Sequence, residues 1–141
     1  MATFEEVKSL ADATYLRIWR DWYKDFPDER PAHHDLQLCD LSAGYSHSRN
    51  WILNPICEGN LDDWDILSQG GWPIWKIQLV HEMVHEYQAK VVTSPSSEGV
   101  SLRARFGRTF WGKGHDEKFF TAIAEKASYF GMTPEQLVER L

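Results

Sequence analysis

Two histidines and a glutamate stand close together in the segment QLVHEMVHEYQ, which covers residues 78–88. A helix advances by about 100° per residue, so His85 lies about 40° and Glu82 about 100° around the helix axis from His81. Two imidazoles one turn apart can bind a single zinc ion, and the glutamate is placed to reach a water molecule beside that ion. The pattern HExxH therefore predicts a zinc ion and the carboxylate base of a hydrolytic reaction.

The same histidine spacing also occurs on solvated helices that bind no metal, so a third ligand must decide between the two interpretations. His33 and His34 lie in an acidic segment flanked by prolines, which predicts a solvated loop. His47 falls in a predicted strand. His115 follows the glycine-rich stretch GKG and opens a predicted helix.

Spacings of four link His115 to Phe119 and Ile123, so His115 shares the face of its helix that packs inward. An inward histidine at a helix start is more often a satisfied core residue than a ligand. Here His81 and His85 already form a predicted zinc site that needs a third ligand, so we prefer the interpretation of His115 as a ligand. The residues that we expect to bind one zinc ion are His81, His85 and His115.

Caps and apolar periodicity predict the elements around these residues. Thr3 with Glu6 forms a capping box that opens a long helix, and apolar residues recur at spacings of three and four to about Phe26. The histidine helix starts near Trp72, with Pro73 in its first turn, and runs to about Val92. An apolar stripe beside the histidines predicts its buried flank: Ile77, Val80, Val84, Tyr87 and Val91. Further predicted elements are strands over 35–41 and 45–54, with a turn at SRN (48–50) or AG (43–44), helices over 60–67, 116–130 and 133–141, and an extended stretch over 100–111. The helix over 116–130 is expected to stop at Gly131, and Thr133 with Gln136 forms a capping box for the last helix.

Composition and charge limit the classes of function. The chain has 141 residues, 43% of them apolar, which predicts one domain over residues 1–141 with a single core. No segment resembles a signal peptide or a membrane span, so we expect a cytoplasmic protein without a membrane partner. The only cysteines, Cys39 and Cys57, form no zinc-binding pattern and are expected to be reduced thiols. The net charge of −6 argues against a surface that coats nucleic acid.

One local exception is the stretch VSLRARFGRTFWGKG at 100–114, which carries four basic residues and no acidic one. Arg103, Arg105, Arg108 and Lys113 could bind the phosphates of DNA or an acidic partner. A loop kept soluble by its arginines is the more common case. DNA is therefore a partner that the sequence allows but does not favour.

Three segments in this order resemble the SprT-like zinc metallopeptidases, the family that includes Spartan: AGYSHSRNWILNPI at 43–56, QLVHEMVHEYQ at 78–88 and GHDEKFF at 114–120. In that family a strand ends in a leucine-asparagine-proline stretch, matched here by Leu53, Asn54 and Pro55. An HExxH helix follows, and a later histidine completes the ligand set. The resemblance covers roughly residues 36–130, and three segments in order are far more specific than any one of them.

The resemblance implies an α+β fold with a minimal zincin-like core, in which a long N-terminal helix and a small antiparallel sheet pack on the HExxH helix and C-terminal helices follow. It also implies that His81, His85 and His115 bind Zn²⁺ and that Glu82 is the general base. The chain departs from the family pattern in three respects. The 29 residues between His85 and His115 make room for an insertion or hairpin. Asp116 replaces the usual glycine after the third histidine, and no cysteine-rich zinc ribbon follows, so the DNA dependence of some relatives is not carried over.

The function that these residues predict is zinc-dependent hydrolysis of peptide bonds in a protein or peptide substrate. Zinc acidifies a water molecule, and Glu82 takes its proton and returns it to the leaving amine. An unpaired strand within 45–53 could bind the substrate by strand addition. Tyr45, Tyr129 and Arg105 are candidates for stabilising the oxyanion, and the sequence favours none of them.

Two other functions compete with peptide hydrolysis. The first is a zinc-binding module of the same fold that interacts with protein or DNA and has little or no peptidase activity. The intact Glu82 disfavours it, because a purely structural zinc site has no use for a base. The second is a helical adaptor without metal, which would leave the shared sector of His81, Glu82 and His85 unexplained.

Overall fold

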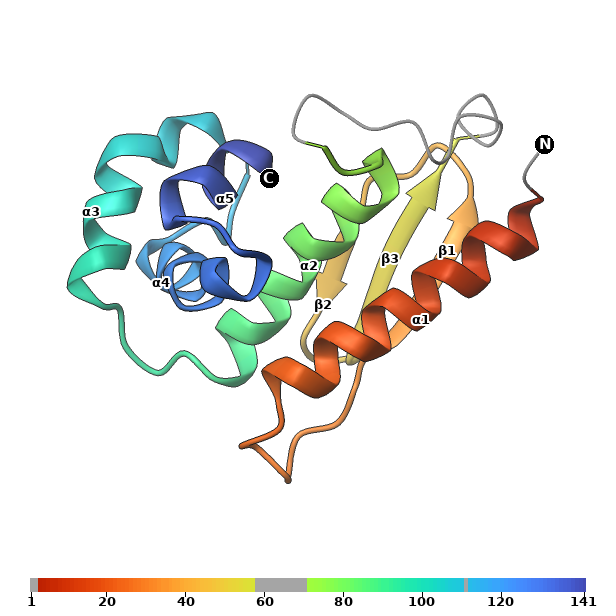
Figure 1. The fold of residues 1–141 in the computed structure, drawn as a ribbon, viewed down its shortest axis with the longest axis horizontal. Helices are drawn as coiled ribbons and strands as arrows, with labels where there is room; N and C mark the ends of the chain where they lie inside the picture. Colours follow the sequence, from red (N-terminus) through yellow and green to blue (C-terminus); the bar gives the residue numbers. More distant parts are fainter. Residues whose placement is uncertain (1–2, 58–70, 111) are drawn as a thin grey trace. The chain divides into compact units, whose positions relative to one another are not determined.

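The computed structural model of the chain describes residues 3–57, 71–110 and 112–141. Its elements form two compact units, Met1–Glu82 and Met83–Leu141, and the boundary falls inside helix α2. The first unit contains a sheet and the second contains helices, so the chain is α+β (Figure 1). The single domain predicted over residues 1–141 stays a prediction. In chain order the elements are α1 (Phe4–Trp22), β1 (His33–Leu38), β2 (Gly44–Ser46), β3 (Trp51–Ile56), α2 (Ile74–Lys90), α3 (Ser97–Phe106), η2 (Gly107–Thr109), α4 (Glu117–Lys126), η3 (Ala127–Phe130) and α5 (Pro134–Arg140).

Helix α1 begins where the sequence predicts, because Thr3 caps it. The Thr3 hydroxyl accepts a hydrogen bond from the Glu6 amide at 3.2 Å. The helix ends at Trp22, before the predicted end near Phe26, and the chain then turns. Its inward face packs along β1. The buried residues of this face are Val7, Ala11, Thr14, Tyr15, Ile18 and Trp22.

The sheet is mixed, and the prediction of a wholly antiparallel sheet is wrong. β3 is the central strand: it pairs in parallel with β1 and antiparallel with β2. Of the two predicted turns, the one at SRN is confirmed: a turn at 47–50 divides the stretch 45–54 into β2 and β3, which pair with each other. The chain reverses direction once between β1 and β2 and again between β2 and β3, so β1 and β3 run in the same direction (Figure 1). A pattern of apolar residues identifies strands, but the order in which they pair depends on the path of the chain between them.

The central position of β3 also limits where a peptide can add to this sheet. β3 is paired on both sides, so most of the stretch 45–53 offers no free strand edge. Among the described residues, β2 pairs with β3 alone, and it is only three residues long. Within the stretch 45–53, β2 is therefore the only described strand with an edge to which a peptide could add.

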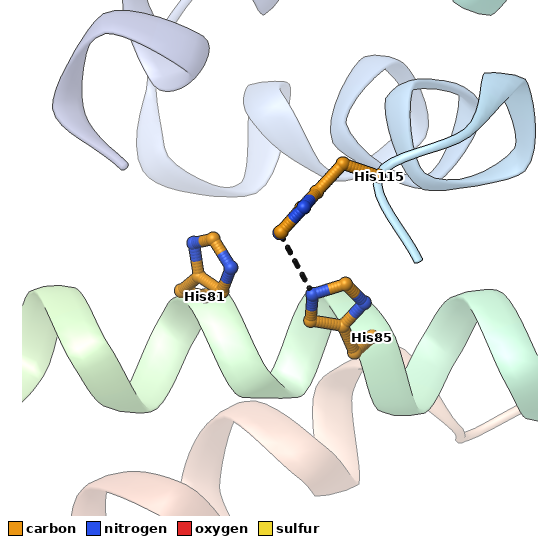
Figure 2. A group of neighbouring side chains, drawn as sticks. All are labelled: His81, His85 and His115. Atoms are coloured by element: carbon orange, nitrogen blue, oxygen red, sulfur yellow. Dashed lines mark hydrogen bonds between the residues drawn. The ribbon is translucent and has the colours of Figure 1, made fainter. Parts of the chain in front are cut away.

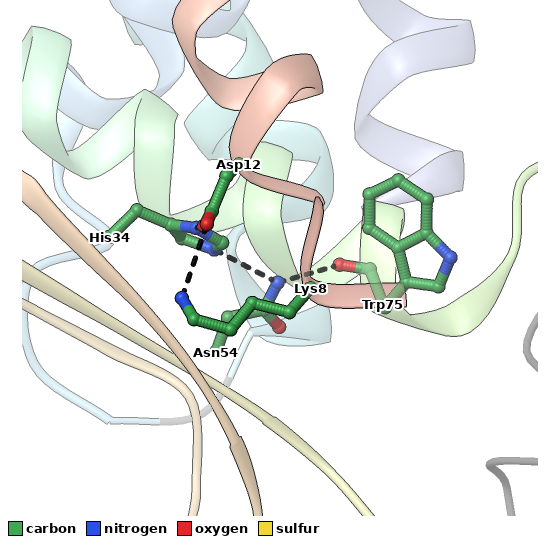
Figure 3. A network of polar contacts seen from close by, with 5 residues as sticks. All are labelled: Lys8, Asp12, His34, Asn54 and Trp75. Carbon is green, nitrogen blue, oxygen red and sulfur yellow. Dashed lines mark hydrogen bonds and ion pairs between the residues drawn. The ribbon is translucent and has the colours of Figure 1, made fainter. Parts of the chain in front are cut away.

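A buried polar network joins α1, β1, β3 and the first turn of α2 (Figure 3). His34 Nδ1 lies 2.7 Å from Asp12 Oδ1, and Lys8 Nζ lies 3.1 Å from Asp12 Oδ2. On the other side of the ring, Asn54 Nδ2 lies 3.5 Å from His34 Nε2 and donates to the Trp75 carbonyl at 3.3 Å. His34 is only 8% exposed, so the prediction of a solvated loop is wrong for this residue. β1 turns it inward because alternate residues of a strand face the same side.

Helix α3 replaces the extended stretch predicted over 100–111, and that prediction is wrong. Leu102 and Ala104 alternate with arginines and so imitate the period of a strand. The chain follows the helical period instead: Ser96 caps the helix by accepting from the Gly99 amide at 3.0 Å, and Gly99 and Leu102 are buried. The four basic residues of this stretch therefore do not lie on a strand.

The last two predicted helices are confirmed. Asp116 caps α4 by accepting from two backbone amides, each at 3.1 Å. The helix predicted over 116–130 consists of α4 followed by η3, and it stops at Gly131, as predicted. Thr133 and Gln136 form the predicted capping box at the start of α5.

The histidine helix is also confirmed, with slightly shorter bounds. α2 starts at Ile74, directly after Pro73, and ends at Lys90. The short helix predicted over 60–67 lies outside the described residues. Of the helices within the described ranges, none has both the length and the apolar character that crossing a bilayer requires.

Candidate metal centre

Helix α2 is buried over most of its circumference, which is more than the predicted apolar stripe. The centre of that stripe is buried, and so are Leu79 and Met83, which lie roughly opposite the histidines on the helix. The half-buried sector carries His81, His85 and Gln88. Burial of the remaining sectors holds the helix in place, and this sector is where its side chains can still reach a ligand.

The partners of His85 determine which of its ring nitrogens can bind a metal. Gln88 Nε2 donates to the Asp116 carboxylate at 2.9 Å, which fixes the orientation of the Gln88 amide. Gln88 Oε1 then lies 3.0 Å from His85 Nδ1 and accepts its hydrogen, so Nε2 carries the lone pair. Burial lowers the pKa of His85 to about 4, and the ring is neutral at neutral pH. Histidine ligands of metals commonly donate their second nitrogen to a neighbour in this way.

His115 is presented by a glycine-rich turn. Gly114 has a φ of 94°, a conformation that favours glycine, and a Cβ at this position would lie 3.4 Å from His85 Cε1. His115 Nδ1 lies 3.4 Å from the Gly112 carbonyl, which accepts its hydrogen. The Phe110 ring stacks on the imidazole, with centroids 5.2 Å apart. These contacts leave the Nε2 of His115 directed at His85.

The two Nε2 atoms of His85 and His115 face each other at 3.2 Å (Figure 2). Two lone pairs at this distance repel each other unless a cation lies between them, either a shared proton or a metal ion. Two nitrogen ligands of a tetrahedral zinc ion, each about 2.0–2.1 Å from the metal, lie about 3.4 Å apart. His81 stands one turn earlier on α2, and one nitrogen of each of the three histidines lies within 4.8 Å of the others. The three predicted residues therefore form a group that could hold a metal ion.

No known family model, curated protein or solved structure matches this chain. The resemblance to SprT-like peptidases thus stays a prediction. The chemistry of the histidine group has to be argued from its own geometry.

Two buried glutamates on α2 differ in their partners. Glu86 is fully buried and forms an ion pair with Lys90 Nζ at 2.7 Å. Glu82 is 6% exposed, and within the described parts of the chain no charged side chain shifts its pKa. Burial alone raises the pKa of Glu82 to about 7. A carboxyl group that exchanges its proton near neutral pH is suited to general acid–base chemistry.

The remaining histidines considered from the sequence do not join this group. His33 is exposed on β1, and His47 is exposed in the turn after β2, where its Nδ1 lies 3.0 Å from the Tyr45 hydroxyl. His34 is engaged in the network with Asp12. In the part of the chain that the structure describes, the only group of three metal-binding side chains is His81, His85 and His115.

Three residues that support the group were missed by the sequence analysis. Gln88 could have been found, because it follows His85 by three positions on the same helix and so shares its face. Asp116 both caps α4 and accepts a hydrogen bond from the Gln88 amide. The contact between Phe110 and His115 could not be predicted, because Phe110 was placed in an extended stretch that gave no reason to bring it to His115.

Proposed function

We propose that this protein is a zinc-dependent metallopeptidase of the SprT-like type, with His81, His85 and His115 as zinc ligands and Glu82 as the general base. The observation that carries the proposal is the 3.2 Å separation of two Nε2 atoms whose ring partners leave both as acceptors. Zinc suits a set of neutral imidazole ligands, and three of them leave one coordination position open, as in catalytic sites.

The residues of the chain divide the work of hydrolysis between them. A bound zinc ion supplies a Lewis acid that acidifies water and polarises a peptide carbonyl. Glu82 takes the proton from the attacking water and returns it to the leaving amine. Gln88 holds His85 in the tautomer that exposes Nε2, and Asp116 in turn orients Gln88.

Glu82 is the reason to prefer hydrolysis over a zinc-binding interaction module. A buried carboxyl group without a charged partner costs folding free energy. Perturbed groups of this kind concentrate at functional sites, where their proton affinity is used. A module that only interacts with protein or DNA would gain nothing from such a group beside its metal ligands.

Metal content and hydrolysis measured on the same samples test the proposal. Protein loaded with zinc and then dialysed is expected to hold one ion per chain by plasma mass spectrometry and to cleave an unstructured protein such as casein. Glu82→Gln is expected to keep the fold and the zinc but to lose a factor of about 10² to 10⁴ in rate. The amide has almost the same volume as the acid and cannot take the proton.

Glu98→Gln is the matched control, because Glu98 is an exposed glutamate in the first turn of α3. It should cleave casein at the wild-type rate. Protein that holds zinc but cleaves nothing would indicate the interaction module instead. Wild-type activity in Glu82→Gln would remove Glu82 from the mechanism, and a protein that binds no zinc would contradict the metal centre itself.

A further inference from the structure

The only two cysteines of the chain are brought together by the parallel pairing of β1 and β3. The register of this pairing places Leu38 opposite Ile56 at the ends of the strands. The Cys39 amide continues the ladder by donating to the Ile56 carbonyl at 3.1 Å. In a parallel ladder, an amide that bonds to one carbonyl stands opposite the next residue of the neighbouring strand. Cys39 therefore stands opposite Cys57.

This position brings the two thiols within reach of each other. Neighbouring strands lie about 4.8 Å apart, and a disulfide needs Cα atoms about 4.4–6.8 Å apart. Residues directly opposite each other in parallel strands direct their side chains to the same face of the sheet. The Asp40 carboxyl group raises the pKa of the Cys57 thiol, and the nearby Cys39 contributes in the same direction, which agrees with their proximity.

Both thiols are also accessible from solvent. Cys57 is exposed, Cys39 is half-buried, and both are free. Side chains on adjacent parallel strands keep their Cβ atoms about as far apart as the strands, whereas the Cβ atoms of a disulfide lie about 3.5–4.5 Å apart. The strand ends must therefore approach slightly when the bond forms. Accessible disulfides under such strain are the ones that are readily reduced again.

We propose that Cys39 and Cys57 form a reversible disulfide, and that the oxidant is a low-molecular-weight disulfide such as oxidised glutathione. One cysteine thiolate attacks a sulfur of the oxidant, which breaks the oxidant's S–S bond and releases one glutathione thiol. The second cysteine then attacks the mixed disulfide and releases the other glutathione thiol. Two electrons pass from the protein to the oxidant, and the two protons of the cysteines end on the released thiols. The new bond closes a ring of the chain that contains β2 and the turn at 47–50.

The test exposes the full chain to oxidised glutathione, blocks the remaining thiols by alkylation and measures the intact mass under denaturing conditions. Both thiols should disappear together, without added glutathione and without a covalent dimer, and a peptide map should contain the linked pair. Reduction with dithiothreitol should restore both thiols. The oxidised protein should unfold at a higher temperature, by about 5 to 10 °C, because the bond restricts the unfolded chain.

Cys39→Ser and Cys57→Ser serve as matched controls, since each keeps one thiol and cannot close the ring. Each should end as a mixed disulfide that carries one glutathione and should show no rise in unfolding temperature. Wild-type protein that carries two glutathiones, forms dimers or keeps two free thiols under the same treatment would overturn the proposal.

Discussion

His34 is a buried imidazole and His85 a half-buried one, and their neighbours use the two ring nitrogens differently. The side chain of His34 is 3% exposed, with Asp12 at its Nδ1 and Asn54 at its Nε2. His85 donates from Nδ1 to Gln88, and its Nε2 faces another imidazole nitrogen, that of His115. The first ring has a complementary partner on each side, whereas the second has an acceptor opposite an acceptor.

The difference separates a histidine that stabilises the fold from one that is ready to bind a cation. In the His34 network each contact joins a donor to an acceptor, and Asn54 can direct one amide hydrogen to the ring and the other to the Trp75 carbonyl. Both nitrogens of the His34 ring thus have a complementary partner without any ligand, although Asn54 Oδ1 is buried without a hydrogen-bond partner in the described structure. The pair of His85 and His115 differs, because the lone pairs of their facing Nε2 atoms repel each other unless a positive charge lies between them.

Removal of the third ligand should have the largest effect. His115→Ala is expected to lose most of the bound zinc and the stability that zinc confers, which is about 4 kcal/mol when free zinc exceeds its dissociation constant a thousandfold. Plasma mass spectrometry measures the metal, and thermal unfolding with and without zinc measures the stability. His33→Ala is the control, because His33 is an exposed histidine. Full zinc content in His115→Ala would mean that another residue completes the site.

The opposite behaviour is expected when the His34 network is broken. Asp12→Ala leaves the buried Nδ1 hydrogen of His34 without its acceptor, which should lower the free energy of unfolding by about 1–3 kcal/mol. Zinc content should stay at the wild-type level, because Asp12 contacts no residue of the histidine group in the described structure. Urea denaturation in the presence of a chelator measures the loss, with the exposed Asp28→Ala as control. A variant of unchanged stability that fails to bind zinc would reverse the assignment of the two clusters.

The sequence predicted those features of the two clusters that depend on neighbouring residues in the chain. The HExxH spacing and the helix that begins at Asp116 follow from residues a few positions apart in the chain. His115 was selected because it lies on an inward helix face and the histidine pair lacked a ligand. The structure brings all three histidines together.

The features that were missed depend on residues far apart in the chain. His34 was expected in solvent because its neighbours in sequence are acidic and proline-rich, but Asp12 and Asn54 reach it from other elements. The parallel pairing of β1 and β3 has the same origin, since no local signal distinguishes it from an antiparallel one. The prediction of an extended stretch over 100–111 was wrong for another reason: the alternation of apolar and basic residues matched a strand, while the cap at Ser96 and the burial of Leu102 favour a helix.

The pH dependence of stability should reveal the state of His34. Burial lowers the pKa of His34 below its ordinary value of 6.5, and the nearby Lys8 acts in the same direction, whereas Asp12 and Asp35 oppose it. The unfolded chain therefore binds the proton more readily than the folded protein. The contribution to stability is complete above about pH 6.5 and is lost as the pH falls through the lower pKa of the folded state.

Urea denaturation between about pH 5 and 7.5, with zinc chelated, measures this contribution. The free energy of unfolding should rise with pH more steeply in the wild type than in His34→Gln. His85, whose pKa is also lowered, is present in both proteins, so the difference in slope belongs to His34. Equal slopes would show that His34 does not have to be neutral in the folded protein.

The smallest effects are expected for the exposed charges of α3, which neither cluster uses. Arg103 Nη1 lies 3.8 Å from Glu117 Oε1, and Arg105 Nη2 lies 2.9 Å from Glu135 Oε1. Exposed ion pairs contribute little to stability, so Glu135→Gln should leave the midpoint of urea denaturation almost unchanged. A clear loss of stability would show that the ion pair between Arg105 and Glu135 contributes to the packing of α5 on α3.

The same pairs predict how weakly this surface should bind DNA. If all four basic residues of 100–114 contacted duplex phosphates, the logarithm of the binding constant would fall with the logarithm of salt concentration with a slope of about −3.6. Arg103 and Arg105 are paired with glutamates, so only two basic residues remain for phosphates, and the expected slope is about −1.8. We therefore expect only weak binding of a short duplex in fluorescence anisotropy titrations at about 50 mM and 200 mM salt. Replacing Glu117 and Glu135 by glutamine should strengthen binding and steepen the slope, since it frees both arginines. Sub-micromolar affinity of the wild type at the higher salt, lost on Arg103→Glu with Arg105→Glu, would instead make α3 a functional surface that binds nucleic acid.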